Sequence, residues 1–120
     1  MPAGTVVMSW NSPQFAQPIL VAGNGHVLYL FTPDDATGTN TCNCPQQWPP
    51  LTTKSGAPKA QGAAKQGLLG VSNGQVTYNG HPLYFYYLDS KPDQPNGQGV
   101  NEVWYVVTVS GNACTSATCM

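Results

Sequence analysis

The sequence contains no arginine and only four lysines, which together with five acidic residues give a net charge of −1 over 120 residues. It therefore has no cationic field of the kind that attracts nucleic-acid phosphates or anionic lipids, and nucleic acid is not an expected partner. Charged residues make up 8% of the chain, against about 25% in typical soluble proteins. This composition favours an exported protein over a cytosolic enzyme.

Long hydrophobic runs are also missing. No stretch of about 18 apolar residues is present, so we expect no transmembrane segment. The chain does not open on a basic segment followed by a hydrophobic one, and we expect any signal peptide or lipid-bearing cysteine to be absent from this sequence or never to have existed. Export must therefore be argued from other features.

Familiar catalytic motifs are absent too. The sequence has no Gly-x-Ser-x-Gly, no phosphate-binding loop and no His-Glu-x-x-His. The spacing of the carboxylates recommends no pair for acid–base chemistry. We therefore predict no enzymatic activity. A thiol redox role, which would need a reducible, exposed pair of cysteines, is the least unfavourable enzymatic alternative.

Four cysteines are present, at Cys42, Cys44, Cys114 and Cys119. An even number fits disulfides in an extracytoplasmic protein. Because a bridge between Cys42 and Cys44 would be strained, we expect either bridges between the two segments or a local bridge from Cys114 to Cys119. The alternative is a thiolate metal site, which with Met120 could bind cuprous copper.

Turn signals separate short segments rich in Val, Tyr, Leu and Thr, which predicts antiparallel β-structure. Asn-Gly suits two-residue hairpin turns because both of their central positions take positive φ. The expected strands are "TVVMSW", those on both sides of Asn24-Gly25, the three joined at Asn73-Gly74 and Asn79-Gly80, and Val103–Val109. A helix has room only around Ala60 to Gln66, where Gly62 weakens it.

An internal repeat is visible. "NGHVLYLFTPD" begins at Asn24 and "NGHPLYFYYLD" begins at Asn79, and each is followed by a polar loop and a tryptophan, Trp48 or Trp104. A single hairpin cannot bury its apolar face alone, so the two units should pack together. We predict an all-β, antiparallel sandwich or barrel made of two pseudo-repeats, with at most one short helix.

The predicted domain organisation follows from this repeat and from the length, which suits one domain over 1–120. We place pseudo-repeat 1 at about 5–54 and pseudo-repeat 2 at about 67–110. A cysteine-containing C-terminal tail occupies 111–120.

Several of these segments carry a family resemblance. "YLFTPD" and "YFYYLD" follow the pattern Tyr-x-aromatic-x-x-Asp, and "WPPL" and "VWYVV" follow them in order. From about Ile19 to Val107 the chain resembles a bacterial family of secreted repeats and lipoprotein-like proteins that carries the Yx(FWY)xxD motif. The resemblance implies a bacterial-type protein that is secreted or lipid-anchored at the cell surface. It implies no biochemical role, because none is established for the family.

This chain departs from the family in one respect. Two cysteines separated by three residues usually precede the first Trp-Pro-Pro, whereas here Asn43 alone separates Cys42 from Cys44. The residues that match the family motif, together with the tryptophans that follow, are Tyr29, Phe31, Asp34, Tyr84, Tyr86, Asp89, Trp48 and Trp104.

The motif residues have two interpretations. In an alternating strand Tyr29 and Phe31 point to one face. The first interpretation makes these aromatics core or cross-strand packing, with Asp34 and Asp89 accepting hydrogen bonds from the backbone or from tyrosine hydroxyls. In the second, the Tyr–Asp pairs line a ligand groove. Exposed Trp and Tyr with Asn and Gln would also suit a carbohydrate platform.

His26 and His81 follow their Asn-Gly turns at matching positions. The simpler interpretation makes them surface or packing residues. Alternatively, pseudo-symmetry brings the two imidazoles together as a site for copper, zinc or haem iron.

We therefore predict a non-catalytic extracytoplasmic structural or interaction domain of the cell envelope or of an extracellular assembly, with no cofactor. Protein partners or self-association are expected, because low charge and β-rich edges favour association. The alternative is a metal- or haem-binding, electron-transfer protein that uses the histidine pair or the cysteines.

Overall fold

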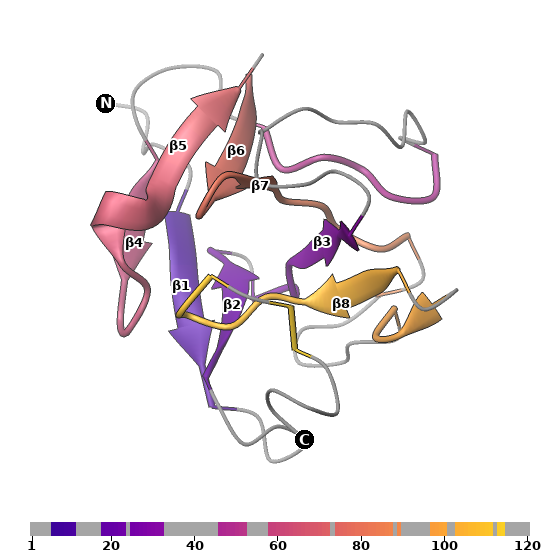
Figure 1. Cartoon of the computed structure of the whole chain (residues 1–120), viewed down its shortest axis with the longest axis horizontal. Helices are drawn as coiled ribbons and strands as arrows, with labels where there is room; N and C mark the ends of the chain where they lie inside the picture. Colours follow the sequence, from indigo (N-terminus) through magenta and orange to yellow (C-terminus); the bar gives the residue numbers. More distant parts are fainter. Residues whose placement is uncertain are drawn as a thin grey trace.

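The computed structural model describes residues 6–11, 18–23, 25–32, 46–52, 58–72, 74–87, 89, 97–100, 103–111 and 113–114. Within these ranges the chain forms short strands and short 3-10 turns, so the predicted all-β class is confirmed (Figure 1). The strands are β1 (Val6–Trp10), β2 (Ile19–Ala22), β3 (Tyr29–Phe31), β4 (Lys59–Gln61), β5 (Leu69–Ser72), β6 (Gln75–Tyr78), β7 (His81–Pro82) and β8 (Trp104–Val106), and η2 (Gln66–Leu68) is a 3-10 turn.

Each repeat begins with an antiparallel pair of strands. In the first repeat β1 pairs with β2, and in the second β5 pairs with β6, which then turns back into β7. The β6–β7 turn has φ of 52° at Asn79 and 82° at Gly80. Two successive positive φ angles are what a type I′ hairpin requires, and Asn-Gly supplies them at little steric cost.

One strand pair is parallel and was not expected from the sequence. β4 runs parallel to β1, with Val6 opposite Lys59 and Met8 opposite Gln61. The stretch from Ala60 to Gln66, where a short helix had room, therefore starts as a strand and only ends in the 3-10 turn. The Gln66 side chain binds the backbone of this strand: its Oε1 accepts from the Ala60 N–H at 2.8 Å and its Nε2 donates to the Pro58 carbonyl at 2.9 Å. A side-chain amide thus satisfies part of the outer edge of β4.

The two repeats meet at their equivalent tyrosines. Tyr29 and Tyr84 form an antiparallel bridge in which each N–H donates to the other's carbonyl at 2.9 Å. Because 84 and 29 are equivalent positions of the repeat, this bridge lies on a local pseudo-twofold axis. Two further bridges, Ile19 with Thr108 and Gln75 with Thr52, are equivalent to each other under this pseudo-twofold axis and lie farther from it.

The repeats exchange partners around this axis. β3 of the first repeat pairs with β8 of the second, and the two lie side by side in Figure 1 although they come from distant parts of the chain. In return, Phe85 donates to the Pro49 carbonyl at 2.7 Å, and Leu51 donates to the Leu83 carbonyl at 3.0 Å. Neither repeat therefore completes its own hydrogen bonding.

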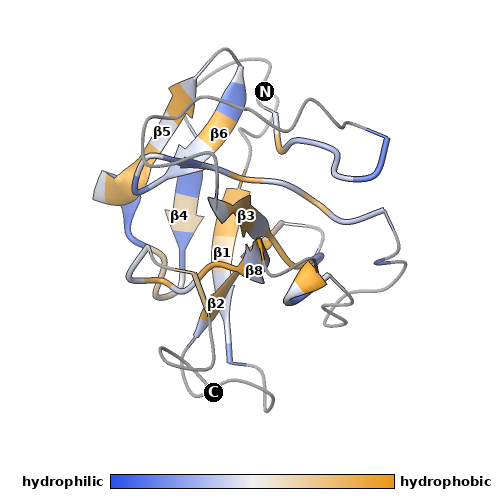
Figure 2. Cartoon of the chain, turned by 45° about the vertical axis from the view of Figure 1, so that its right-hand side comes forward, coloured by the Kyte–Doolittle hydropathy of each residue, from blue (hydrophilic) through white to orange (hydrophobic). Residues whose placement is uncertain are grey.

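The central strands bury side chains on both faces, which separates two hydrophobic clusters. Leu28 and Leu30 point into an aliphatic cluster, whereas Tyr29 points into an aromatic one, as alternation along a strand requires. Figure 2 shows the hydrophobic residues that run through β1, β2 and β5. The buried members of the aliphatic cluster are Val7, Leu20, Ala22, Leu28, Leu30, Leu51, Val76, Tyr78, Leu83 and Val107.

Truncation in the aliphatic cluster should be costly. Leu83 is fully buried, so Leu83→Ala should lower the free energy of unfolding by about 2–5 kcal/mol, through lost burial and the cavity left behind. Urea denaturation measures this loss. The matched control is Val71→Ala, because Val71 is 48% exposed and its truncation should change stability by less than about 0.5 kcal/mol. Equal losses in both variants would contradict the assigned core.

Candidate functional site

Four aromatic rings stack on one another at the centre of the aromatic cluster, and we call them the aromatic ladder: Phe31, Trp104, Trp48 and Tyr86. The Trp48 and Trp104 rings are parallel within 3°, with centroids 3.7 Å apart. Phe31 covers Trp104 at 4.4 Å and 29°, and Tyr86 covers Trp48 at 4.3 Å and 30°. Successive rings come alternately from the two repeats. At about 0.5–1.5 kcal/mol for each aromatic contact, the ladder is a strong link between the repeats.

The flanking tyrosines extend the symmetry of the ladder. Tyr29 meets the Trp48 ring edge-on at 5.4 Å and 78°, and Tyr84 meets the Trp104 ring edge-on at 5.0 Å and 89°. The pseudo-twofold relation of the strands thus holds for the side chains as well. Tyr29, Tyr84, Trp48 and Trp104 are buried, whereas Phe31 and Tyr86, at the two ends of the ladder, are half-buried.

A buried hydrogen bond joins the two copies of the motif. The Tyr29 hydroxyl of the first repeat donates to Oδ2 of Asp89 in the second at 2.5 Å, and it accepts from the Gly97 N–H at 3.1 Å. Asp89 is only 6% exposed and Tyr29 is fully buried. A carboxylate buried to this extent needs such a donor. Burial, and secondarily the bond to Asp89, raise the pKa of Tyr29 well above its usual range. Asp34, the equivalent of Asp89, lies outside the described residues.

Gly97 allows this bond to form because it has no side chain. A Cβ at position 97 would lie 2.8 Å from Cη2 of Trp48 and 3.0 Å from Cγ of Tyr86. The backbone at Gly97 therefore passes directly over the ladder and reaches the Tyr29 hydroxyl. Any larger residue would push against two rings that are already held by stacking.

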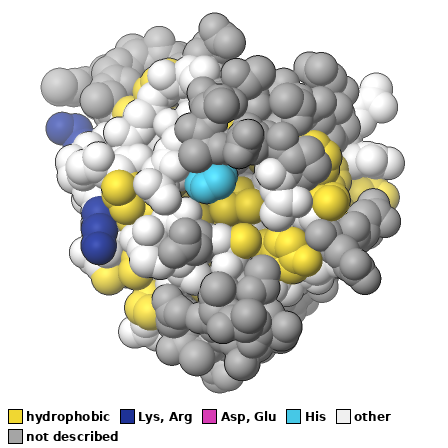
Figure 3. Space-filling view, in the orientation of Figure 1, with side chains coloured by type: hydrophobic (Ala, Val, Ile, Leu, Met, Phe, Trp, Pro, Cys, Tyr) yellow, Lys and Arg dark blue, Asp and Glu magenta, His cyan; other side chains and the backbone are white. Residues whose placement is uncertain are grey.

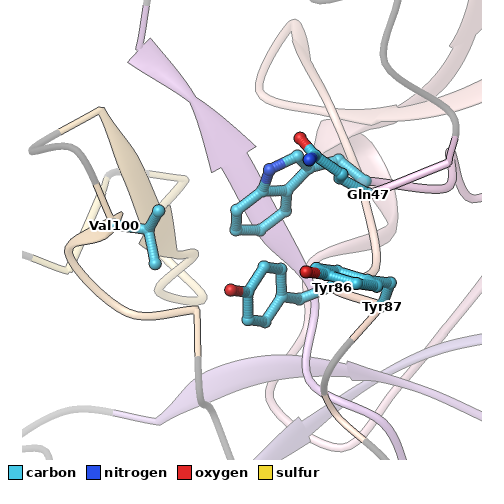
Figure 4. Close-up of a pocket in the computed structure, with 5 residues that line it drawn as sticks. Gln47, Tyr86, Tyr87 and Val100 are labelled. Atoms are coloured by element: carbon cyan, nitrogen blue, oxygen red, sulfur yellow. The ribbon is translucent and has the colours of Figure 1, made fainter.

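The ladder ends in a surface pocket at Tyr86. This pocket has a volume of about 180 Å³, and we call it the aromatic pocket; the described residues that line it are Gln47, Trp48, Tyr86, Tyr87 and Val100. Figure 4 shows the rings of Tyr86 and Tyr87 on one side and Val100 across from them, with Gln47 above.

The described lining of the aromatic pocket combines aromatic rings with neutral polar groups. The Tyr87 ring is 54% exposed and stands edge-on to the Tyr86 ring at 5.4 Å. Partial burial, followed by the neighbouring Tyr87, raises the pKa of Tyr86, so its hydroxyl stays protonated at neutral pH. No charged side chain is among the five residues of the lining. The pocket therefore offers aromatic surface, hydroxyl groups and an amide.

The two histidines are not brought together. Each precedes its bridge tyrosine by three residues, and because the strands are antiparallel the two lie on opposite sides of the bridge, about 20 Å apart along the strands. The His26 ring instead meets Phe85 edge-on at 6.4 Å. Nδ1 of His81 is buried without a hydrogen-bond partner. Across the described part of the chain, no group of three or more His, Cys, Asp or Glu side chains could hold a metal ion.

The cysteines are described at one position. Cys114 is fully buried in the aromatic cluster and is not a free thiol. Its N–H donates to the Val106 carbonyl at 2.8 Å, and its own carbonyl accepts from Nε2 of Gln98 at 2.5 Å. Cys42, Cys44 and Cys119 lie outside the described residues, so their pairing stays a prediction.

The comparison with known families now supports the resemblance. Residues 72–108 match the Lipoprotein_15 family, described as a secreted repeat of unknown function. This range covers the second repeat from the end of β5 to β8, and the resemblance predicted from the sequence is confirmed there. The family indicates an extracytoplasmic domain. No curated protein matches the chain, and no solved structure matches it. Among the described residues, no helix is long and apolar enough to cross a membrane.

Sequence reasoning missed three residues of the aromatic pocket: Gln47, Tyr87 and Val100. Tyr87 adjoins a motif residue, so its proximity to the site could have been anticipated. Gln47 and Val100 come from polar loops, and no sequence pattern marks them. The matched positions of Trp48 and Trp104 were visible, but their stacking depends on the register between distant strands.

Removing the Tyr29 hydroxyl should destabilise the fold. Tyr29→Phe leaves Asp89 and the Gly97 N–H without this partner, and we expect a loss of about 2–3 kcal/mol in the free energy of unfolding. Denaturant unfolding measures it. Tyr87→Phe removes the same group from an exposed ring and should change stability by less than about 0.5 kcal/mol. Equal free energies of unfolding for Tyr29→Phe and Tyr87→Phe would show that the Tyr29–Asp89 bond does not hold the repeats together.

Stability should also fall at alkaline pH. Because the pKa of Tyr29 is raised in the folded state, the unfolded tyrosine loses its proton first, above pH of about 10. The contribution is fully present below that pH and decreases above it, by about 1.4 kcal/mol per pH unit for each such tyrosine. Burial also raises the pKa of Tyr78. Tyr29→Phe should show a shallower decline than the parent in urea unfolding between pH 9 and 11; parallel curves would contradict this assignment.

Proposed function

We propose that this chain is a non-catalytic extracytoplasmic interaction domain and that the aromatic pocket is its contact surface. The match to a secreted-repeat family supports the extracytoplasmic setting. The arrangement of the motif aromatics supports the interaction role, because Tyr29, Tyr84 and the two tryptophans are buried, whereas Tyr86 at the end of the ladder lines a surface pocket.

The observation that carries this proposal is the continuity between the aromatic pocket and the ladder. Tyr86 lines the pocket and stacks on Trp48, which in turn stacks on Trp104. One wall of the pocket is therefore fixed by the contact between the repeats. A ligand that meets a fixed wall loses less affinity to the ordering of side chains than one that meets a mobile loop.

The acidic residue that the structure describes is not among the described residues of the aromatic pocket. Asp89, the acidic residue within the described part of the chain, is buried and engaged with Tyr29. In the aromatic pocket, the raised pKa of Tyr86 keeps its hydroxyl protonated at neutral pH. The aromatic pocket can therefore bind a neutral group. General-base catalysis would instead need a side chain that can accept a proton within reach of the substrate.

Binding to cell envelopes tests the proposal. The purified full chain should sediment with envelopes isolated from the organism that encodes it, and the supernatant should contain no newly released soluble fragments. Tyr87→Ala should weaken binding roughly tenfold, because exposed aromatic anchors dominate binding energy. Val71→Ala, which truncates a residue that does not line the pocket, is the matched control and should bind like the parent.

Two results would contradict the proposed function. One is equal envelope binding by Tyr87→Ala and the parent, provided that thermal unfolding shows both to be folded. The other is release of soluble fragments from the envelope, which would show that the protein is an enzyme.

A further inference from the structure

We propose that the ligand of the aromatic pocket is a single ring of a neutral saccharide. This inference rests on the proposed function and names the class of molecule that the pocket binds. Its volume of about 180 Å³ lies below the roughly 300–1,000 Å³ typical of pockets for drug-sized ligands. A ligand group of the size of one sugar ring fits such a pocket.

The mixture of groups in the lining matches the two sides of a pyranose. A pyranose presents a face of C–H groups and an edge of hydroxyl groups. The half-exposed ring of Tyr87 offers an apolar surface on which the C–H face of the sugar can stack, as amphipathic aromatic rings do. The Gln47 amide and the hydroxyls of Tyr86 and Tyr87 can each donate and accept hydrogen bonds, which suits the hydroxyl edge of the sugar.

The described residues of the lining favour a neutral sugar. No Lys, Asp, Glu or His is among the five lining residues. An anionic sugar or a phosphate would lose hydration without gaining a counter-charge, which is unfavourable. On the face shown in Figure 3, the basic side chains of described residues lie towards one edge of the molecule.

A proline-rich peptide is the competing ligand class, because aromatic-lined grooves also bind polyproline helices. A proline ring carries no hydroxyl group. It would leave the Gln47 amide and the tyrosine hydroxyls without partners on the ring that fills the pocket. A saccharide satisfies these groups and the aromatic face together, so the lining favours the saccharide.

The lining residues take different roles in this site. Tyr87 supplies the exposed ring, and Tyr86, held by Trp48, supplies the fixed one. Gln47 supplies hydrogen bonds to ring hydroxyls. Replacing Tyr87 with Phe keeps the apolar face, whereas Tyr87→Ala removes it. Gln47→Ala removes hydrogen bonds and leaves both rings in place.

Titration of the ¹⁵N-labelled full chain tests the inference by NMR. The probes are chitotetraose, cellotetraose and maltotetraose, with decaproline as the competing class. At least one saccharide should shift the amide signals of Gln47, Tyr86, Tyr87 and Val100. Tyr87→Ala should weaken its binding by roughly tenfold or more, whereas Tyr87→Phe should stay within about threefold of the parent. Val71→Ala should bind like the parent.

The outcomes separate this inference from the proposed function. Shifts of the four signals by decaproline and by no saccharide would overturn the saccharide and leave the interaction role in place. Saccharide shifts confined to other residues, or no shifts with any probe, would also overturn it. If envelope binding nevertheless depends on Tyr87, only the ligand class is wrong; if it does not, the proposed function fails as well.

Discussion

The pair of backbone hydrogen bonds between Tyr29 and Tyr84 is the constraint on which the rest of the structure depends. It sets the register of the two repeats, and because side chains alternate along a strand it also decides which residues face which cluster. A slip of one residue would turn Tyr29 and Phe31 towards the aliphatic cluster and Leu28 and Leu30 towards the aromatic one. The ladder, the buried hydroxyl and the pocket all require this single register.

Local features of the fold could be predicted from the sequence, and contacts between distant segments could not. The Asn79-Gly80 hairpin was predictable because its two residues are suited to positive φ by their own chemistry. The parallel pairing of β4 was not, because its partner β1 is distant in the sequence. The histidines show that an internal repeat does not by itself reveal which equivalent residues lie close together. Equivalent residues of a twofold repeat meet only near the axis, where Tyr29 and Tyr84 lie, and His26 and His81 are displaced from it in opposite directions.

The candidate site shows the same division. The motif tyrosines and Asp89 were identifiable, but which repeat supplies the partner of Tyr29 depends on the exchange of strands. The bond runs from the first copy of the motif to the second, so each copy is incomplete as a unit of structure. A motif that recurs along the chain can thus encode contacts between units. For this reason the aromatic and acidic residues of the motif, which could be interpreted as lining a groove, are largely buried.

The exchange of strands between equivalent halves has an evolutionary consequence. A single ancestral unit with this geometry would complete itself only by pairing with an identical molecule, so the present chain is what gene duplication and fusion of a homodimer would produce. While two subunits are identical, every substitution appears at both ends of a stack of rings. Once they are fused, the ends can diverge: one now carries Phe31 and the other Tyr86. In such a fused chain one end of the ladder can carry the Tyr86 hydroxyl group without a hydroxyl at the other end, where Phe31 lies.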